Sequence, residues 1–281
     1  MVYINGEFVE NDKAQISVYD HGLLYGDGTF EGIRFYDKKI FLMEEHVARL
    51  LNSCKALALE LNIDADKIIE LTYKTIELSG LKDGYIRLLI TRGRGKLGIS
   101  PFLCAEPGII IIVDTIRLYP EEFYSKGISL ITSSFRRTPL DSLDTRIKSL
   151  NYLNNVLAKA EAVRAGYPEA LILNHNGRIA ECSGDNIFIV KKGRCITPHV
   201  VEGALEGITR GFVIKKAIEM SIDCEEGFLT LYDLFTADEC FLTGTAAEIV
   251  PVVEVDKRKI GEGIPGPITA QFHNEYKKAI A

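Results

Sequence analysis

The sequence lacks the residue spacings that are typical of disulfide-rich and metal-binding proteins. None of its six cysteines forms a Cys-x-x-Cys pair, and its five histidines lie far apart along the chain. A chain of 281 residues can bury a sufficient core without covalent cross-links. We therefore expect reduced thiols in a cytoplasmic protein, and we expect no metal site.

Long apolar runs and an excess of positive charge are also missing. The longest aliphatic run covers residues 109–113, far too short to cross a bilayer, and the first twelve residues have no signal-peptide pattern. The net charge is -6, from 33 basic and 39 acidic residues, whereas a general nucleic-acid binder usually needs a basic face. We expect neither a membrane nor a nucleic acid as a partner. The hydrophobic content of 47% allows a substantial core and a buried subunit interface as well.

Strand and helix patterns follow one another without a βαβ rhythm. The N-terminal half predicts a hairpin, two amphipathic helices and two apolar strands, at residues 2–10, 44–61, 66–79, 85–91 and 108–115. The strand pattern breaks near residue 118, and mixed strands and helices follow. This predicts an α+β or irregular α/β fold. We expect a small N-terminal α+β domain (1–116), a linker (117–127) and a large C-terminal domain (128–281).

One lysine has apolar neighbours and stands just before a strongly apolar helix pattern. Lys148 lies between Ile147 and Leu150. A lysine in such surroundings can form an imine with a carbonyl group. Most lysines at a helix start are solvated. The imine-forming role of Lys148 therefore needs support from other motifs in the sequence.

Two segments are suited to binding an anion. Gly207 and Thr209 precede a helix with apolar periodicity, so free N–H groups and a hydroxyl meet at a helix N-terminus, which suits a phosphate. Residues 243–247 form a turn of small residues between two apolar stretches, where backbone N–H groups can converge. An ordinary helix cap and a plain tight turn are the respective alternatives.

A carboxylate precedes the apolar strand pattern at residues 187–190. Glu181 begins the segment Glu-Cys-Ser-Gly-Asp-Asn, where a carboxylate could hold a protonated ring nitrogen. A polar hairpin turn is the alternative.

Two glycine-rich segments are excluded as nucleotide sites. Residues 26–32 are spaced Gly-x-Gly-x-x-x-Gly with no helix pattern after them, and residues 93–96 lack parts of a P-loop.

Taken together and in order, these strings resemble the fold-type IV enzymes that use pyridoxal 5'-phosphate (PLP). The resemblance covers essentially the whole chain. The most similar group is the branched-chain amino-acid aminotransferases, which have counterparts of YGDGTFEGIR, EEHVARL, YIRLLITRG, IKSLNYLNNVLAKAEA, GITR and GTAAEIVPV. GITR alone is a weak signal, whereas IKSLNYLN with GTAAEIVPV at this separation is strong. The resemblance implies a two-domain architecture with the cofactor in the C-terminal domain.

The resemblance also implies an activity, namely PLP-dependent transamination of L-leucine, L-isoleucine and L-valine with 2-oxoglutarate, as in branched-chain amino-acid biosynthesis. It implies that Lys148 forms the internal aldimine with PLP and carries protons. Glu181 matches the carboxylate that pairs with the pyridine nitrogen, and Tyr152 matches the tyrosine near the phenolic oxygen. With the ring nitrogen protonated, the cofactor accepts the negative charge that develops at the substrate's Cα.

Phosphate contacts are implied by four further matches. Arg49, in the string His-Val-Ala-Arg-Leu, matches a phosphate-binding arginine. Ile208, Thr209 and Thr245 match residues that contact the phosphate through backbone and hydroxyl groups. The resemblance thus gives the two predicted anion sites a common ligand.

Substrate contacts are implied in the same way. The backbone of Thr245 and Ala246, with Tyr85, matches the site of the substrate's α-carboxylate. Arg87 matches the residue that accommodates the second carboxylate of glutamate. The walls of the side-chain pocket match Phe30, Tyr25 of the partner subunit and Ile99 of the partner subunit. These last matches imply a homodimer or a higher homo-oligomer.

Related activities share the lysine and the glutamate. D-amino-acid aminotransferases typically have an Arg-x-His signature, and aminodeoxychorismate lyases an Arg-Gly-Tyr segment, in the loop that here reads Arg-Gly-Lys-Leu-Gly-Ile at residues 94–99. Tyr85 and Arg87 favour the branched-chain activity, while side activity toward D-amino acids or amines stays open. A non-catalytic phosphate-binding protein is disfavoured because Lys148 and Glu181 are intact.

Three features depart from the family pattern. Cys182 stands where many members have glycine, so its larger side chain is expected to shift the turn after Glu181. Glu206 places an acid beside the expected phosphate site unless its side chain turns to solvent. Residues 92–100 are more basic than the family pattern leads us to expect, which could favour acidic substrates, although we favour a solvated loop.

Overall fold

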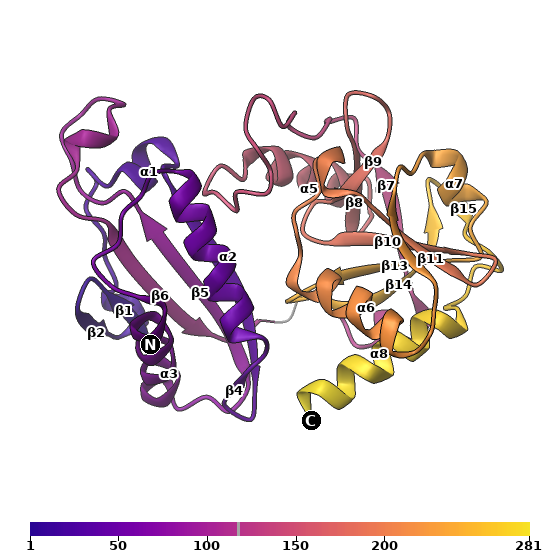
Figure 1. Ribbon diagram of the computed structural model, residues 1–281, viewed down its shortest axis with the longest axis horizontal. Coiled ribbons are helices and arrows are strands. Elements are labelled where there is room, and N and C mark those ends of the chain that lie inside the picture. Colours follow the sequence, from indigo (N-terminus) through magenta and orange to yellow (C-terminus); the bar gives the residue numbers. More distant parts are fainter. Residues whose placement is uncertain (117–118) are drawn as a thin grey trace. The chain divides into compact units, whose positions relative to one another are not determined.

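The structure, a computed structural model, describes residues 1–116 and 119–281. The chain divides into two compact units (Figure 1), one of Met1–Ile116 with Ile147–Asn151 and one of the remaining residues. Part of the predicted linker, residues 117 and 118, lies outside the described residues, and the rest includes the short helix α4 (Glu122–Lys126). The predicted domain limits stay a prediction. The structure adds that residues 147–151, with Lys148, pack with the first unit.

The first unit is built on a six-stranded antiparallel sheet. Its strands are β1 (Val2–Ile4), β2 (Glu7–Val9), β3 (Gly28–Tyr36), β4 (Lys39–Ile40), β5 (Gly84–Thr91) and β6 (Gly108–Asp114). They lie in the order β2-β1-β6-β5-β3-β4. The helices of this unit are α1 (His21–Tyr25), α2 (Met43–Ala56) and α3 (Ala65–Ser79), with 3-10 turns η1 (Asn11–Lys13) and η2 (Pro101–Leu103).

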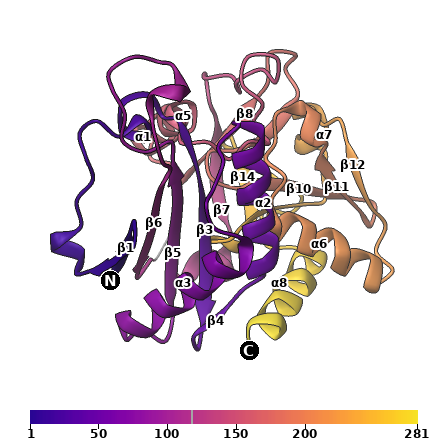
Figure 2. The same cartoon turned by 60° about the vertical axis from the view of Figure 1, so that its left-hand side comes forward.

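Helices α2 and α3 cover one face of this sheet, as Figures 1 and 2 show. Successive side chains of a strand point to opposite faces. Ile86, Leu88 and Ile90 of β5 are therefore buried in the core beneath the helices. Tyr85 and Arg87, which alternate with them, are only partly buried. The sheet thus has one apolar face for folding and one face that carries predicted substrate contacts.

The ends of the two helices follow from local chemistry. Helix α3 begins after Asp64, whose side chain accepts a hydrogen bond from the backbone N–H of Lys67, and it ends at Gly80, as predicted. Helix α2 ends at Ala56, five residues before the predicted end at residue 61. The guanidinium of Arg92 donates to the carbonyls of Leu57 (2.7 Å) and Ala58 (2.8 Å), and these bonds cap the helix early.

The second unit is built on a nine-stranded sheet. Its strands are β7 (Ile128–Thr132), β8 (Glu169–Leu173), β9 (Ile179–Cys182), β10 (Asn186–Lys191), β11 (Arg194–Pro198), β12 (Cys224–Gly227), β13 (Glu239–Gly244), β14 (Glu248–Val255) and β15 (Arg258–Lys259). Besides α4, the helices are α5 (Leu153–Arg164), α6 (Ile208–Glu219), α7 (Leu231–Phe235) and α8 (Pro267–Ile280), with the 3-10 turn η3 (Val200–Glu202).

The sheet of the second unit mixes parallel and antiparallel neighbours. The order is β12-β11-β10-β13-β14-β7-β8-β9, with β15 beside β14. The pairs β11–β12, β14–β7 and β7–β8 are parallel, and the other neighbouring pairs are antiparallel. Together with the antiparallel sheet of the first unit, this confirms the predicted mixed α+β class.

The central strands of the second unit are buried on both faces. Phe188 of β10 stacks on Phe241 of β13 with 4.9 Å between ring centroids, and Phe272 of α8 packs against Phe241. Ile187 and Leu242 are fully buried in the core on the other face. This explains the continuous apolar runs of β10 and β13. Among the described residues, no helix is both long and apolar enough to cross a membrane.

Candidate active site

Lys148 is held by its main chain at the edge of β3. Its carbonyl oxygen accepts hydrogen bonds from the backbone N–H of Phe30 (3.0 Å) and from the hydroxyl of Thr29 (2.8 Å). Its own N–H donates to the hydroxyl of Ser53 on α2 (3.2 Å). Its side-chain Nζ lies 4.6 Å from the centroid of the Phe30 ring. The position of Lys148 is thus fixed by backbone atoms, while the amine lies over an aromatic face.

Phe30 shares its face of the sheet with two other predicted substrate contacts. The guanidinium carbon of Arg87 lies 4.7 Å from the centroid of the Phe30 ring and 5.3 Å from that of the Tyr85 ring. Arg87 stands directly opposite Gly32 in the β3–β5 pair. A Cβ at residue 32 would collide with the Tyr85 hydroxyl where it now lies, so Gly32 leaves room for that hydroxyl on this face. The structure therefore brings Lys148, Phe30, Tyr85 and Arg87 together within the first unit.

The residues predicted to act on a neighbouring subunit lie on a separate, exposed stretch. Tyr25 ends α1, and its hydroxyl accepts a hydrogen bond from the backbone N–H of Gly98 (3.0 Å). Ile99 follows in the same loop and is 86% exposed. The side chains of Leu23 and Phe102 nearby in the sequence are exposed as well. The first unit thus presents an apolar surface around α1 and the loop 97–102.

In the second unit, Glu181 of β9 is buried in a network of donors. Its Oε1 pairs with the guanidinium of Arg137 (2.6 Å). Its Oε2 accepts hydrogen bonds from the side chain of Asn186 (3.1 Å) and from the backbone N–H of Leu205 (2.8 Å). A carboxylate can accept further bonds beyond these. The network holds Glu181 in one orientation, with a full positive charge beside it.

Asn186 connects Glu181 to the start of α6. Its side chain also donates to the carbonyl of Leu205 (2.9 Å), and it packs so closely on Gly207 that a Cβ there would collide with it. Helix α6 begins at Ile208, one residue before the predicted start near Thr209, so Thr209 lies in its first turn. The hydroxyl of Thr209 is buried and finds no hydrogen-bond partner within the described residues. An unsatisfied hydroxyl at a helix N-terminus suits an anionic ligand.

The turn with Thr245 and Ala246 lies next to this network. It connects β13 to β14, and the register pairs Thr243 at the end of β13 with Asn186 at the start of β10. The carboxylate of Asp185 packs against Gly244, where a Cβ would collide with it. Burial and the charge of Glu169 raise the pKa of Asp185 to about 7. The second unit therefore brings the predicted ring-nitrogen and phosphate contacts together.

Tyr152 and Arg49 complete the predicted set. Tyr152 is the residue just before α5 and is partly buried in the second unit. Arg49 lies on α2 of the first unit, where its guanidinium pairs with Glu31 (2.7 Å). Arg49 is thus placed by a helix of the first unit, and Tyr152 directly precedes a helix of the second.

Two residues that support Glu181 were not found by sequence reasoning. Arg137 stands in a loop between β7 and α5, and the sequence predicts Asn186 only as a residue where a turn meets a strand. Arg137 is buried and also donates to the carbonyl of Gly203 (2.8 Å). The string Phe-Arg-Arg-Thr-Pro around Arg137 has no periodicity or spacing that would mark it. Only the carboxylate of Glu181, which needs a partner once buried, signals that such a cation must exist.

The three departures from the family pattern are accommodated. Cys182 is fully buried in the core of the second unit, and burial raises its thiol pKa well above the ordinary value, so it acts as a small apolar side chain. Glu206 is exposed. In the basic loop, Arg92 pairs with Asp27 (2.9 Å).

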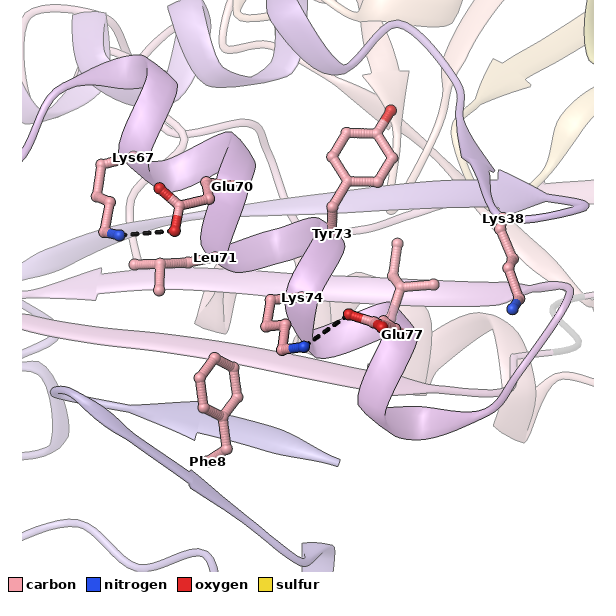
Figure 3. A pocket seen from close by; sticks show the side chains of 9 residues that line it. Phe8, Lys38, Lys67, Glu70, Leu71, Tyr73, Lys74 and Glu77 are labelled. Carbon is pink, nitrogen blue, oxygen red and sulfur yellow. Dashed lines mark hydrogen bonds and ion pairs between the residues drawn. The ribbon is translucent and has the colours of Figure 1, made fainter.

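A pocket of about 620 Å³ lies elsewhere, beside α3 (Figure 3). Two of its lysines, Lys67 and Lys74, are paired with Glu70 and Glu77, each at 2.7 Å, on the exposed side of the helix. Such exposed pairs contribute little to stability. The residues that line this pocket include none of the predicted site residues.

Comparison with known proteins identifies the family. The family model for amino-transferase class IV matches residues 28–255. A Methanocaldococcus jannaschii protein is 48% identical over 276 residues, which cover 98% of this chain and 95% of that protein. The chain is also similar to the solved branched-chain amino acid aminotransferase of Escherichia coli, with a TM-score of 0.95, 37% identity and coverage of 99% of this chain and 93% of that one.

A second solved structure adds a ligand. The branched-chain amino acid aminotransferase of T. thermophilus, complexed with N-(5'-phosphopyridoxyl)-L-glutamate, matches with a TM-score of 0.92 and 36% identity, covering 99% of this chain and 93% of that one. The family match spans both units of the fold, from β3 to β14. The lysine, the buried carboxylate and the helix start described above all lie within the matched residues, and the chain belongs to the class IV aminotransferase family.

Proposed function

We propose that this protein transfers amino groups between branched-chain L-amino acids and 2-oxoglutarate, with PLP as its cofactor. The observation that carries the proposal is the placement of Lys148, whose amine lies 4.6 Å from the ring of Phe30 on the sheet face that also carries Arg87. An amine, an apolar wall and a guanidinium are the groups that a transaminase for both aliphatic and acidic substrates needs. The similar E. coli and T. thermophilus enzymes support the substrate class.

The residues of the chain fit PLP. The buried hydroxyl of Thr209 at the start of α6 suits the phosphate, together with Ile208 and Thr245 and with the guanidinium of Arg49. Glu181, paired with the guanidinium of Arg137, suits a protonated ring nitrogen. The T. thermophilus structure holds a phosphopyridoxyl group. When bound, PLP supplies an aldehyde for the substrate amine and a ring that accepts electrons from the substrate's Cα.

The residues of this chain then orient the substrate and move one proton. We assign two roles to the Nζ of Lys148: it would hold the cofactor covalently, and as a free amine it would take the proton from the substrate's Cα. Glu181 retains the proton at the ring nitrogen, and the hydroxyl of Tyr152 acts near the phenolic oxygen. The backbone N–H groups of Thr245 and Ala246, with the hydroxyl of Tyr85, hold the α-carboxylate.

Specificity must allow two unlike side chains in one pocket. Phe30, with Tyr25 of the partner subunit and Ile99 of the partner subunit, forms apolar walls for an aliphatic side chain. Arg87 receives the second carboxylate of glutamate by a charge-assisted, bidentate pair. The glutamate moiety in the T. thermophilus complex supports such a dual pocket.

A panel of amino donors tests the proposal. With 2-oxoglutarate as the acceptor, L-leucine, L-isoleucine and L-valine are expected to react faster than L-alanine, L-aspartate or any D-amino acid. Product 2-oxo acids can be quantified by chromatography. A preference for D-alanine over L-leucine would refute the branched-chain assignment and favour the D-specific activity of related enzymes.

Removing the charge of Arg87 is expected to separate the two half-reactions. Arg87→Leu should impair the reaction with glutamate or 2-oxoglutarate by about 100-fold or more, because a bidentate charged pair is lost. Deamination of L-leucine should change by less than about 3-fold, since no charge is needed there. Single-turnover absorbance measurements follow each half-reaction separately. An equal loss in both would mean that Arg87 acts through the fold.

We also propose a homodimer in which each pocket includes residues of the neighbouring subunit. The exposed apolar side chains around α1 and the loop 97–102, with Ile99 86% and Phe102 93% exposed, support a partner on this surface. Sedimentation velocity of the active enzyme is expected to give a dimer or a larger oligomer. Activity that sediments as a monomer would contradict the proposal.

A cytoplasmic location is proposed as well, supported by six cysteines that are all unpaired.

A further inference from the structure

A buried carboxylate on β3 joins two side chains of α2, and none of the roles proposed above uses it. Glu31 is completely buried. Its Oε1 accepts a hydrogen bond from Nε of Arg49 (2.8 Å), and its Oε2 accepts one from an Nη of Arg49 (2.7 Å). The same Oε2 accepts a hydrogen bond from Nδ1 of His46, also at 2.7 Å. The three side chains thus form one buried cluster in the first unit.

Burial and neighbouring groups determine the protonation states of Glu31 and His46. Burial alone raises the pKa of Glu31, but the charge of Arg49 and the hydrogen bonds from Arg49 and His46 outweigh burial and lower the pKa to about 2. Burial lowers the pKa of His46, so its imidazole is neutral. Since a carboxylate only accepts hydrogen bonds, the proton of His46 is on Nδ1. The cluster therefore contains one ion pair and one neutral donor that holds the carboxylate.

Local geometry explains why these residues meet. His46 and Arg49 are three positions apart and lie on the same face of α2. Glu31 lies between Phe30 and Gly32 on β3, so its side chain points to the opposite face, toward α2. Strand β3 therefore presents Phe30 toward the amine of Lys148 and Glu31 toward Arg49.

We infer that Glu31, supported by His46, is a positioning residue that fixes the guanidinium of Arg49 for the cofactor's phosphate. This rests on the proposed function. The two parallel bonds define the plane and direction of the guanidinium. A single-point cation such as lysine could not be oriented in this way. A purely structural ion pair would stabilise the fold without changing how tightly a phosphate is held.

Cofactor affinity of the apoprotein distinguishes these two roles. We would titrate apoprotein with PLP and, separately, with pyridoxal, which has the same ring and aldehyde but no phosphate. Glu31→Gln is expected to weaken PLP binding by about 10-fold to 100-fold, the range typical of outer partners of ligand-binding residues. Pyridoxal affinity should change by less than about 3-fold. The double variant Glu31→Gln with Arg49→Lys should bind PLP no more weakly than Arg49→Lys alone, because both remove one interaction.

Controls keep the outcomes separate. Glu239→Gln removes a different buried carboxylate, which accepts hydrogen bonds at the start of α8, and it should change neither affinity. If Glu31→Gln does not fold, His46→Gln retains the Glu31–Arg49 pair and should still lower the ratio of PLP to pyridoxal affinity. An unchanged ratio in a folded variant, or an equal loss for both ligands, would overturn the role of Glu31. If the wild-type protein binds both ligands equally, the phosphate site of the proposed function fails instead.

Discussion

Replacing Lys148 by alanine is expected to reduce transamination of L-leucine by about 10⁴-fold or more. Covalent attachment of the cofactor and the proton transfer at Cα are both assigned to the Nζ of this side chain, and no neighbouring group can replace both. The fold should tolerate the change. The bonds that hold this segment to Thr29, Phe30 and Ser53 use main-chain atoms of Lys148, and alanine retains them.

Two measurements check this prediction. Single-turnover reaction with L-leucine gives the loss of rate, and borohydride reduction of the wild-type holoenzyme, followed by peptide mapping, should find the cofactor on Lys148. Lys74→Ala is a suitable control, because Lys74 pairs with Glu77 on the exposed side of α3, and this variant should react at the wild-type rate. Recovery of the reduced cofactor on another lysine, such as Lys159, would show that the assignment is wrong.

Much of the fold could be predicted because its signals are local. The apolar spacing of α3 and its terminal glycine fix where that helix ends. The alternation of β5 likewise assigns Ile86 and Leu88 to the core and leaves Arg87 on the other face. Helix α2 was predicted five residues too long, because its end depends on the side chain of Arg92, more than thirty residues away. Such a long-range cap leaves no trace in the local pattern.

The residues of the candidate site also fall into two groups, those that the sequence predicts and those that only tertiary contacts define. Glu181 could be proposed from its string and the family resemblance, whereas Arg137, which neutralises it, comes from a loop without any recognisable pattern. Glu31 is part of a string that the sequence identified, yet its role depends on Arg49 being brought to it across the packing of α2 on β3. Residues that contact a ligand recur in recognisable strings, while the residues that orient them are defined by tertiary contacts.

Changing Glu181 to glutamine is expected to slow the proton transfer by about 30-fold to 1,000-fold, equivalent to about 2–4 kcal/mol of transition-state stabilisation. An ionised carboxylate keeps the ring nitrogen protonated, and the ring can then accept the charge that develops when Cα loses its proton. An amide has no such charge. The loss should therefore appear in kcat for leucine deamination, with a smaller change in cofactor affinity, since the phosphate contacts remain.

Glutamine at position 181 also disturbs the local network. Both oxygens of Glu181 accept hydrogen bonds, from Arg137 on one side and from Asn186 and Leu205 on the other. The amide nitrogen of glutamine must face donors on one of these sides, so some loss of stability is expected. A slower reaction alone would not separate this structural cost from the electrostatic role.

A matched variant and a kinetic isotope effect distinguish the loss of stability from the loss of the electrostatic role of Glu181. Glu202→Gln changes another buried glutamate of the second unit, which pairs with Arg178 (3.0 Å) and accepts a hydrogen bond from Asn174 (2.6 Å). It should lower the thermal unfolding temperature and leave the proton transfer unchanged. With L-leucine deuterated at Cα, Glu181→Gln should show a larger kinetic isotope effect than the wild type, because proton transfer becomes more rate-limiting. Near-normal turnover and an unchanged isotope effect in Glu181→Gln would mean that the carboxylate does not control the charge of the ring nitrogen.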